Sequence, residues 1–159
     1  MPPPDVETAI RTEYEWLCRT LGLSPVTLDV YEFAPASTDV TIPGTPLAES
    51  NPGFSPGLAR IWLPTTAADV LPKVPPAAPK TWLKQAPEWA PWRIELWHEV
   101  LHQLSANLGV YDAGEPGRQR TDGSWSTKGH GIGWWTSVQA AASKLGCVTP
   151  DELDSLLDR

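Results

Sequence analysis

The chain has 159 residues, of which 41% are hydrophobic, and it carries a formal net charge of −7. This length and apolar content predict one folded domain with a substantial core, while eighteen prolines predict long irregular connections. The acidic balance disfavours direct binding to nucleic acid, and we expect neither a signal peptide nor a membrane span. We therefore expect a monomeric cytoplasmic protein. Its two cysteines, Cys18 and Cys147, are too few for a disulfide framework.

The first half of the chain predicts one helix and two strands. A helix over residues 5–21 has a single apolar face, with Asp5 as its cap, and ends at Gly22. Two segments rich in β-branched and aromatic residues, 26–33 and 58–63, predict strands that are each ended by a proline.

Proline-rich loops separate these elements. The first covers about residues 35–57, with room for a short strand near residues 39–42. The second covers about residues 64–91 and contains Trp82 and Trp89. Because so long a connection is unusual inside a compact domain, we expect it to form either one wall or lid of a cleft or a spacer.

A His-Glu-x-x-His pattern follows at His98, Glu99 and His102, inside a predicted amphipathic helix that Gly109 ends. Histidines four residues apart lie one above the other on a helix, so both imidazoles can reach one metal ion. Glu99 lies beside the first histidine, where its carboxylate can take a proton from a metal-bound water. The apolar stripe of this helix is Ile94, Trp97, Leu101, Leu104 and Leu108.

His130 is the only other histidine in the chain and is our first choice for a third ligand. It lies in a Gly-His-Gly-Ile-Gly-Trp segment whose glycines let the backbone pass close to a metal. A site of two histidines and one acidic residue is also known chemistry, which leaves Asp122 in reserve and Glu115 as a further alternative. Three imidazoles would leave one zinc position open, as in catalytic sites.

The rest of the chain predicts a polar loop over residues 110–129 and two helices. The first helix covers residues 133–145 and is ended by Gly146, and the second is short and opens with a cap at Thr149. Three side chains of the polar loop are candidates to stabilise a developing oxyanion: Tyr111, Arg118 and Arg120.

The two histidine motifs together resemble the SprT-like zinc metallopeptidases, in which His-Glu-x-x-His is followed by a later His-Gly and, two residues on, an aromatic residue. The resemblance covers at most residues 58–146. It implies an α+β fold of minimal gluzincin type. In that fold, a small, mostly antiparallel sheet packs against an N-terminal helix, the motif helix and a C-terminal helix pair. It also implies Zn²⁺ bound by His98, His102 and His130, with Glu99 as the catalytic base.

The function that the resemblance implies is a zinc-dependent endopeptidase acting on protein or peptide substrates. In that family the strand before the motif helix is a sheet edge with which substrate backbone can pair. Pattern alone allows an interior strand equally well. The residues expected to contact substrate are Arg60, Ile61, Trp62 and Tyr111. Two alternatives remain: an inactive metal-binding or peptide-binding scaffold domain, and a zinc hydrolase of a non-peptide amide.

Overall fold

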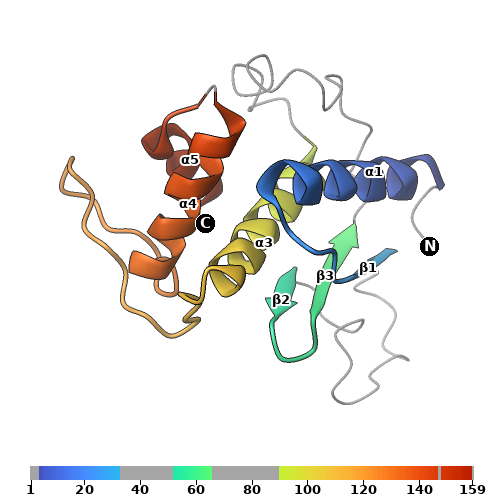
Figure 1. Ribbon diagram of the computed structural model, residues 1–159, viewed down its shortest axis with the longest axis horizontal. Helices are drawn as coiled ribbons and strands as arrows, with labels where there is room; N and C mark the ends of the chain where they lie inside the picture. Colours follow the sequence, from blue (N-terminus) through green and yellow to red (C-terminus); the bar gives the residue numbers. More distant parts are fainter. Residues whose placement is uncertain (1–3, 33–51, 66–89, 147, 159) are drawn as a thin grey trace.

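The computed structural model describes residues 4–32, 52–65, 90–146 and 148–158. These residues form an α+β fold of four helices and one three-stranded sheet, as the sequence predicts (Figure 1). In chain order the elements are α1 (Pro4–Leu21), β1 (Thr27–Glu32), β2 (Gly53–Ser55), β3 (Arg60–Thr65), α3 (Pro91–Asn107), α4 (Ile132–Leu145) and α5 (Pro150–Leu157).

The sheet is mixed, with strand order β1-β3-β2. β1 pairs with β3 in parallel along six residues, and β2 pairs with β3 in antiparallel orientation along three. The expectation of a mostly antiparallel sheet is therefore wrong. The chain between Glu32 and Arg60 exceeds the roughly dozen residues that a parallel crossover needs, so the longer pairing can be parallel.

β3 is the central strand and not an edge. Its residues alternate between half-buried and buried, and Ile61, Leu63 and Thr65 point into the core. Arg60 and Trp62 therefore lie on the opposite face of the sheet, because successive side chains of a strand alternate. Of the two alternatives that the sequence left open, the interior strand is the one observed.

The loop boundaries also need correction. Gly53–Ser55 forms β2, although the sequence predicted a loop there, and a side chain at Gly53 would collide with the ring of Trp62. Pro64 does not end β3, which continues to Thr65. The strand expected near residues 39–42, and Trp82 and Trp89 of the second loop, lie outside the described residues.

The helix signals were more reliable than the loop signals. α3 and α4 end before Gly109 and Gly146, both in the left-handed conformation with φ of 76° and 72°. Thr149 caps α5 by accepting a hydrogen bond from the amide of Glu152. α1 begins at Pro4, so Asp5 lies inside it instead of capping it.

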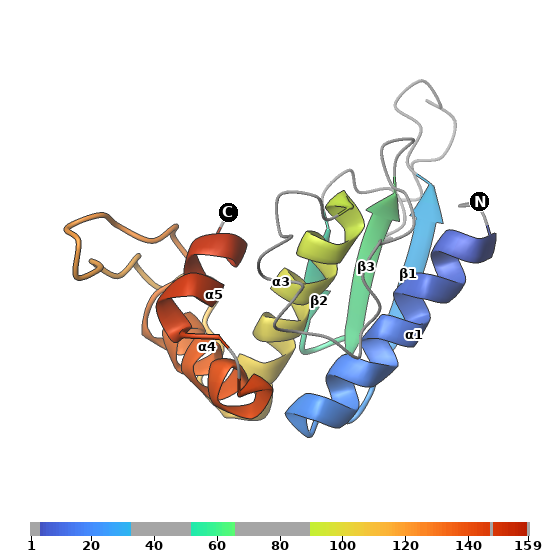
Figure 2. The same cartoon turned by 90° about the horizontal axis from the view of Figure 1, so that it is seen from above.

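α3 runs through the middle of the molecule, between the sheet on one side and the α4–α5 pair on the other (Figures 1 and 2). Most of its residues are buried, including Trp92, Leu96 and Leu104. The exception in the predicted stripe is Leu108, which is 44% exposed because it lies beyond the last helical turn. This central place fixes the backbone that carries the His-Glu-x-x-His pattern.

A buried polar contact joins α1 to α3. The Glu13 carboxylate accepts hydrogen bonds from the Arg93 guanidinium, with Nε–Oε2 at 2.8 Å, and from the Trp97 indole at 3.0 Å. Both charged side chains are 1% exposed. Since an unpaired buried charge is very costly, this pair fixes the register of the two helices.

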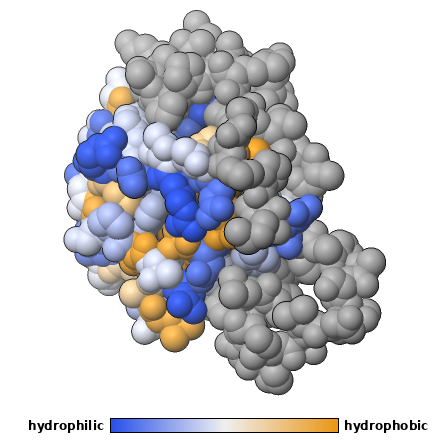
Figure 3. Space-filling model, turned by 90° about the vertical axis from the view of Figure 1, so that its right-hand side faces the viewer, coloured by the Kyte–Doolittle hydropathy of each residue, from blue (hydrophilic) through white to orange (hydrophobic). Residues whose placement is uncertain are grey.

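None of the helices in the described parts of the chain combines the length and the apolar character needed to span a lipid bilayer. Figure 3 shows the face on the right-hand side of Figure 1, where the described residues present hydrophilic side chains interspersed with small hydrophobic areas.

Candidate metal centre

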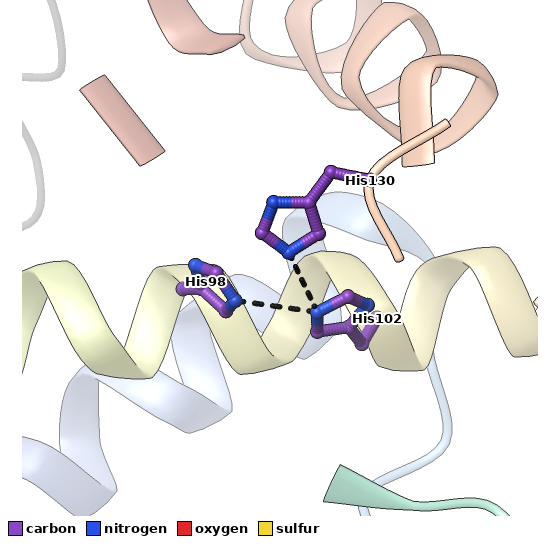
Figure 4. A group of neighbouring side chains, drawn as sticks. All are labelled: His98, His102 and His130. Carbon is purple, nitrogen blue, oxygen red and sulfur yellow. Dashed lines mark hydrogen bonds between the residues drawn. The ribbon is translucent and has the colours of Figure 1, made fainter. Parts of the chain in front are cut away.

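Three histidines meet where α3 passes the start of α4. His98 and His102 lie on one face of α3, and His130 reaches toward them from the segment before α4 (Figure 4). The Nε2 atom of His102 lies 3.2 Å from Nε2 of His98 and 3.3 Å from Nε2 of His130. Ligand atoms of all three residues lie within 4.8 Å of one another, close enough to bind one metal ion.

The hydrogen bonds of the Nδ1 atoms of His98 and His130 determine which nitrogen of each ring carries the proton. His98 Nδ1 lies 2.7 Å from the carbonyl oxygen of Leu157, which can only accept, so this nitrogen carries the proton. His130 Nδ1 donates in the same way to the carboxylate of Asp158, at 2.5 Å. The Nε2 atoms of both rings are therefore unprotonated when the histidines are neutral, and both face His102.

Burial, and then the positive charges that His98 and His130 would carry, lowers the pKa of His102 to about 3. His102 is thus neutral at physiological pH, as a metal ligand must be. One proton on its Nε2 could satisfy only one of the two neighbouring nitrogens. A cation, in contrast, would satisfy all three nitrogens.

Two of the three nitrogen–nitrogen distances match those of a tetrahedral zinc site, and the third lies within 4.8 Å. Two nitrogens bound to one tetrahedral ion at about 2.0–2.1 Å lie about 3.3–3.4 Å apart. The observed separations of 3.2 and 3.3 Å agree with that geometry. The residues present therefore fit Zn²⁺ or another ion that accepts three imidazoles.

The side chain of Glu99 lies next to the imidazole of His98. Its Oε1 is 3.9 Å from Nε2 of His98, and the residue is 5% exposed. Burial, and then the negative charge of Glu95, raises the pKa of Glu99 to about 8. Without a cation this carboxyl group is mostly protonated at neutral pH, and the positive charge of a bound ion would favour the carboxylate form that can take and return a proton.

Aromatic rings surround the imidazoles. Trp134, in the first turn of α4, stacks on His130 at 4.0 Å between centroids and lies 5.0 Å from the rings of His98 and His102. Tyr111 meets His102 edge-on at 5.8 Å and also contacts Phe54 of β2 at 5.6 Å. Of the four side chains expected to contact substrate, Tyr111 is thus the one that lies against a candidate ligand.

Glu115 has a role that the sequence analysis missed. Its carboxylate accepts hydrogen bonds from the amides of Gly131, Gly133 and Trp134, at 2.8, 3.1 and 3.2 Å. It therefore caps the N-terminus of α4 from the loop that precedes this helix and holds the segment that carries His130, instead of serving as a ligand. The carboxylate also complements the positive end of the helix dipole.

The glycines around His130 let the backbone come close to another part of the chain, but not to the candidate metal position as the sequence suggested. A side chain at Gly133 would lie 2.0 Å from the carbonyl oxygen of Val110, and one at Gly131 would lie 2.3 Å from that of Pro116. The glycines therefore let the start of α4 pack directly on the backbone of the preceding loop.

Charged side chains lie on the side of His130 that faces away from His102, and they include the carboxylate that contacts His130. Arg120 pairs with Asp158 and with Asp154, the latter at 2.8 Å, and Asp154 also accepts a hydrogen bond from the Trp134 indole at 2.9 Å. Burial raises the pKa of Asp158, but hydrogen bonds from His130 and Thr127 outweigh burial and hold that pKa below its usual value. The partner of His130 is therefore an anion at neutral pH.

The remaining candidates from the sequence lie elsewhere. Asp122 is fully exposed and accepts hydrogen bonds from Ser124 in its own turn. The Arg118 guanidinium lies 3.8 Å over the ring of Trp135 and 3.6 Å from Asp154, so it and Arg120 face the α4–α5 pair. Arg60 pairs with Asp29 across the sheet, away from the core face.

A pocket of about 290 Å³ opens next to Phe54, beyond His102 along α3. Its walls come from the end of α3, the turn between α1 and β1, and the β2–β3 hairpin. They include Leu23, Val26, Pro56, Gln103 and Ala106.

Comparison of the chain with models of known protein families, with curated proteins and with solved structures finds no match.

Proposed function

We propose that this protein is a zinc-dependent endopeptidase of SprT-like type. The observation that carries the proposal is the convergence of three imidazole Nε2 atoms beside the buried carboxyl group of Glu99. This arrangement matches the roles that the two sequence motifs imply. Zn²⁺ bound there would supply a water acidified toward neutral pKa and would polarise the carbonyl group of a substrate.

The residues of the chain have separate tasks in this mechanism. His98, His102 and His130 would hold the ion with neutral rings. Glu99 takes a proton from the attacking water and later passes it to the leaving amine. Tyr111, whose ring contacts His102, is the candidate that remains for stabilising the oxyanion.

A substrate peptide could pair with β2, and not with β3 as the sequence analysis expected. Among the described residues, the free sheet edge nearest the histidines belongs to β2, since β3 is paired on both sides. Phe54 of β2 connects this edge to Tyr111 and also lines the neighbouring pocket. Backbone pairing with β2 would bring a peptide past the metal point while the pocket receives an apolar side chain.

The first test is metal content by elemental mass spectrometry. We expect about one zinc per chain in the wild type and in Asp122→Ala, and little in His130→Ala. Asp122→Ala is the matched control because it removes an exposed carboxylate that was the reserve ligand. Zinc retained in full by His130→Ala would refute the three-histidine site.

The second test is hydrolysis of an unfolded protein substrate by the wild type and by Glu99→Gln. The amide keeps the shape of the side chain but cannot act as a base, so zinc should stay bound while hydrolysis is lost. Turnover by Glu99→Gln would refute the mechanism. Bound zinc without any turnover in the wild type would favour a scaffold domain, and activity confined to small amides would favour a non-peptide hydrolase.

A further inference from the structure

The end of α5 contacts two of the three histidines. The carbonyl oxygen of Leu157 and the carboxylate of Asp158 are adjacent in the chain, and each accepts a hydrogen bond from an Nδ1 atom, of His98 and His130 respectively. The distances are 2.7 and 2.5 Å, and both histidines are buried. One short segment thus contacts one candidate ligand from α3 and another from the segment before α4.

The geometry of a helix end explains why these acceptors are available. The last carbonyl groups of a helix have no partner within the helix, so the Leu157 oxygen is free to accept from a side chain. Asp158 is the C-terminal cap residue, and its amide still bonds to the carbonyl of Asp154. Its carboxylate therefore projects from a fixed backbone toward His130.

α5 is held in place by contacts that do not involve the histidines. Leu153 and Leu157 are completely buried, and the Thr149 cap closes the other end of the helix. Asp154 joins α5 to Trp134 of α4 and to Arg120 of the preceding loop. Arg120 also pairs with Asp158, so the carboxylate is held from both sides.

We propose that Leu157 and Asp158 are positioning residues of the metal centre, so that docking of α5 and metal binding stabilise each other. This inference rests on the metal site of the proposed function. An acceptor on Nδ1 fixes the tautomer and the ring orientation of a ligating histidine, and a carboxylate also makes the ligand more basic. The coupling free energy between docking of α5 and metal binding is the same in both directions. Bound metal therefore stabilises the docked position of α5 by as much as docked α5 stabilises metal binding.

The decisive experiment measures the affinity for Zn²⁺ by competition with a chelator, and the visible spectrum of the Co²⁺-loaded protein. The variants are Asp158→Ala, Asp158→Asn and Asp151→Ala. The last is the matched control, because it removes an exposed carboxylate from the same helix. Loss of a ligand's hydrogen-bond partner typically weakens metal binding about 10–100-fold, and we expect that effect in Asp158→Ala.

The other variants separate positioning from simple stabilisation. Asp158→Asn keeps an oxygen that can accept from His130, so its affinity should lie between those of the wild type and Asp158→Ala. Asp151→Ala should bind like the wild type. The Co²⁺ spectrum of Asp158→Ala should change, which a loss of helix stability alone would not cause. Metal should also slow hydrogen exchange of the α5 amides in the wild type.

Two results would overturn the inference, and they can be told apart. Wild-type affinity and an unchanged Co²⁺ spectrum in Asp158→Ala would refute the role of Asp158 while leaving the metal site standing. Absence of metal binding in the wild type would refute the metal site itself, and the inference with it.

Discussion

The buried carboxyl group of Glu99 should make the metal-free protein less stable as the pH rises. Its pKa lies at about 8 in the folded state, against 4.5 for an ordinary glutamate. The folded chain therefore binds this proton more tightly than the unfolded chain does. The contribution of Glu99 to the free energy of unfolding should accordingly be greatest below its ordinary pKa, fall as the pH rises from about 4.5 to about 8, and change little above that.

The size of this effect follows from the linkage between proton binding and folding. One pKa unit corresponds to about 1.4 kcal/mol, so between about pH 5 and pH 8 the ionisation of Glu99 should remove on the order of 3 kcal/mol of stability. Glu99→Gln removes this titration. Its free energy of unfolding, relative to the wild type, should therefore rise by roughly that amount over the same pH interval.

Urea denaturation followed by tryptophan fluorescence, in the presence of a chelator, measures this difference at the two pH values. Glu15→Gln is the matched control because Glu15 is exposed on α1. If the stability difference between Glu99→Gln and the wild type does not change with pH, the carboxyl group is not perturbed by burial and the reasoning fails.

Three further predictions concern the surrounding structure. Glu115→Ala removes the cap of α4 and should lower the free energy of unfolding by about 1–2 kcal/mol, measured by urea denaturation; an unchanged midpoint would show that the cap is dispensable. Arg93→Met leaves Glu13 charged and buried and should cost about 3–5 kcal/mol, most of which Glu13→Leu in the same chain should restore; equal stability of the single and double variants would contradict this. Cys18 is 1% exposed, and its burial raises the pKa of the thiol. In a Cys147→Ser background, iodoacetamide should therefore label Cys18 only after denaturation, which mass spectrometry would detect. Rapid labelling of the native protein would refute the burial of Cys18.

The parts of the fold that depend on local signals could be predicted from the sequence. The apolar face of α1, the glycine at the end of α3 and the Thr149 cap of α5 each depend on residues within one or two helical turns. The closeness of His98, His102 and His130 was predicted too, because the two motifs contain every histidine in the chain.

The parts that the sequence did not reveal depend on contacts between distant residues. Nothing near Glu115 indicates that its carboxylate caps a helix that begins seventeen residues later. The central position of β3 depends on the pairing of two other strands, one of which the turn residues of the loop concealed. Asp158 is one acidic residue among many and belongs to no motif, so only the packing of α5 reveals its contact with His130.

The contact between His98 and Leu157 has a consequence for the order of folding. The two residues are separated by 59 positions in the chain, and contacts of such long range form only after the loop between them has closed. A molecule in which α1, α3 and the sheet have assembled but α5 has not docked lacks the acceptors for both Nδ1 atoms. Such a partly folded molecule would bind metal weakly, so the proposed metal-dependent activity would be absent until the core of the chain was complete.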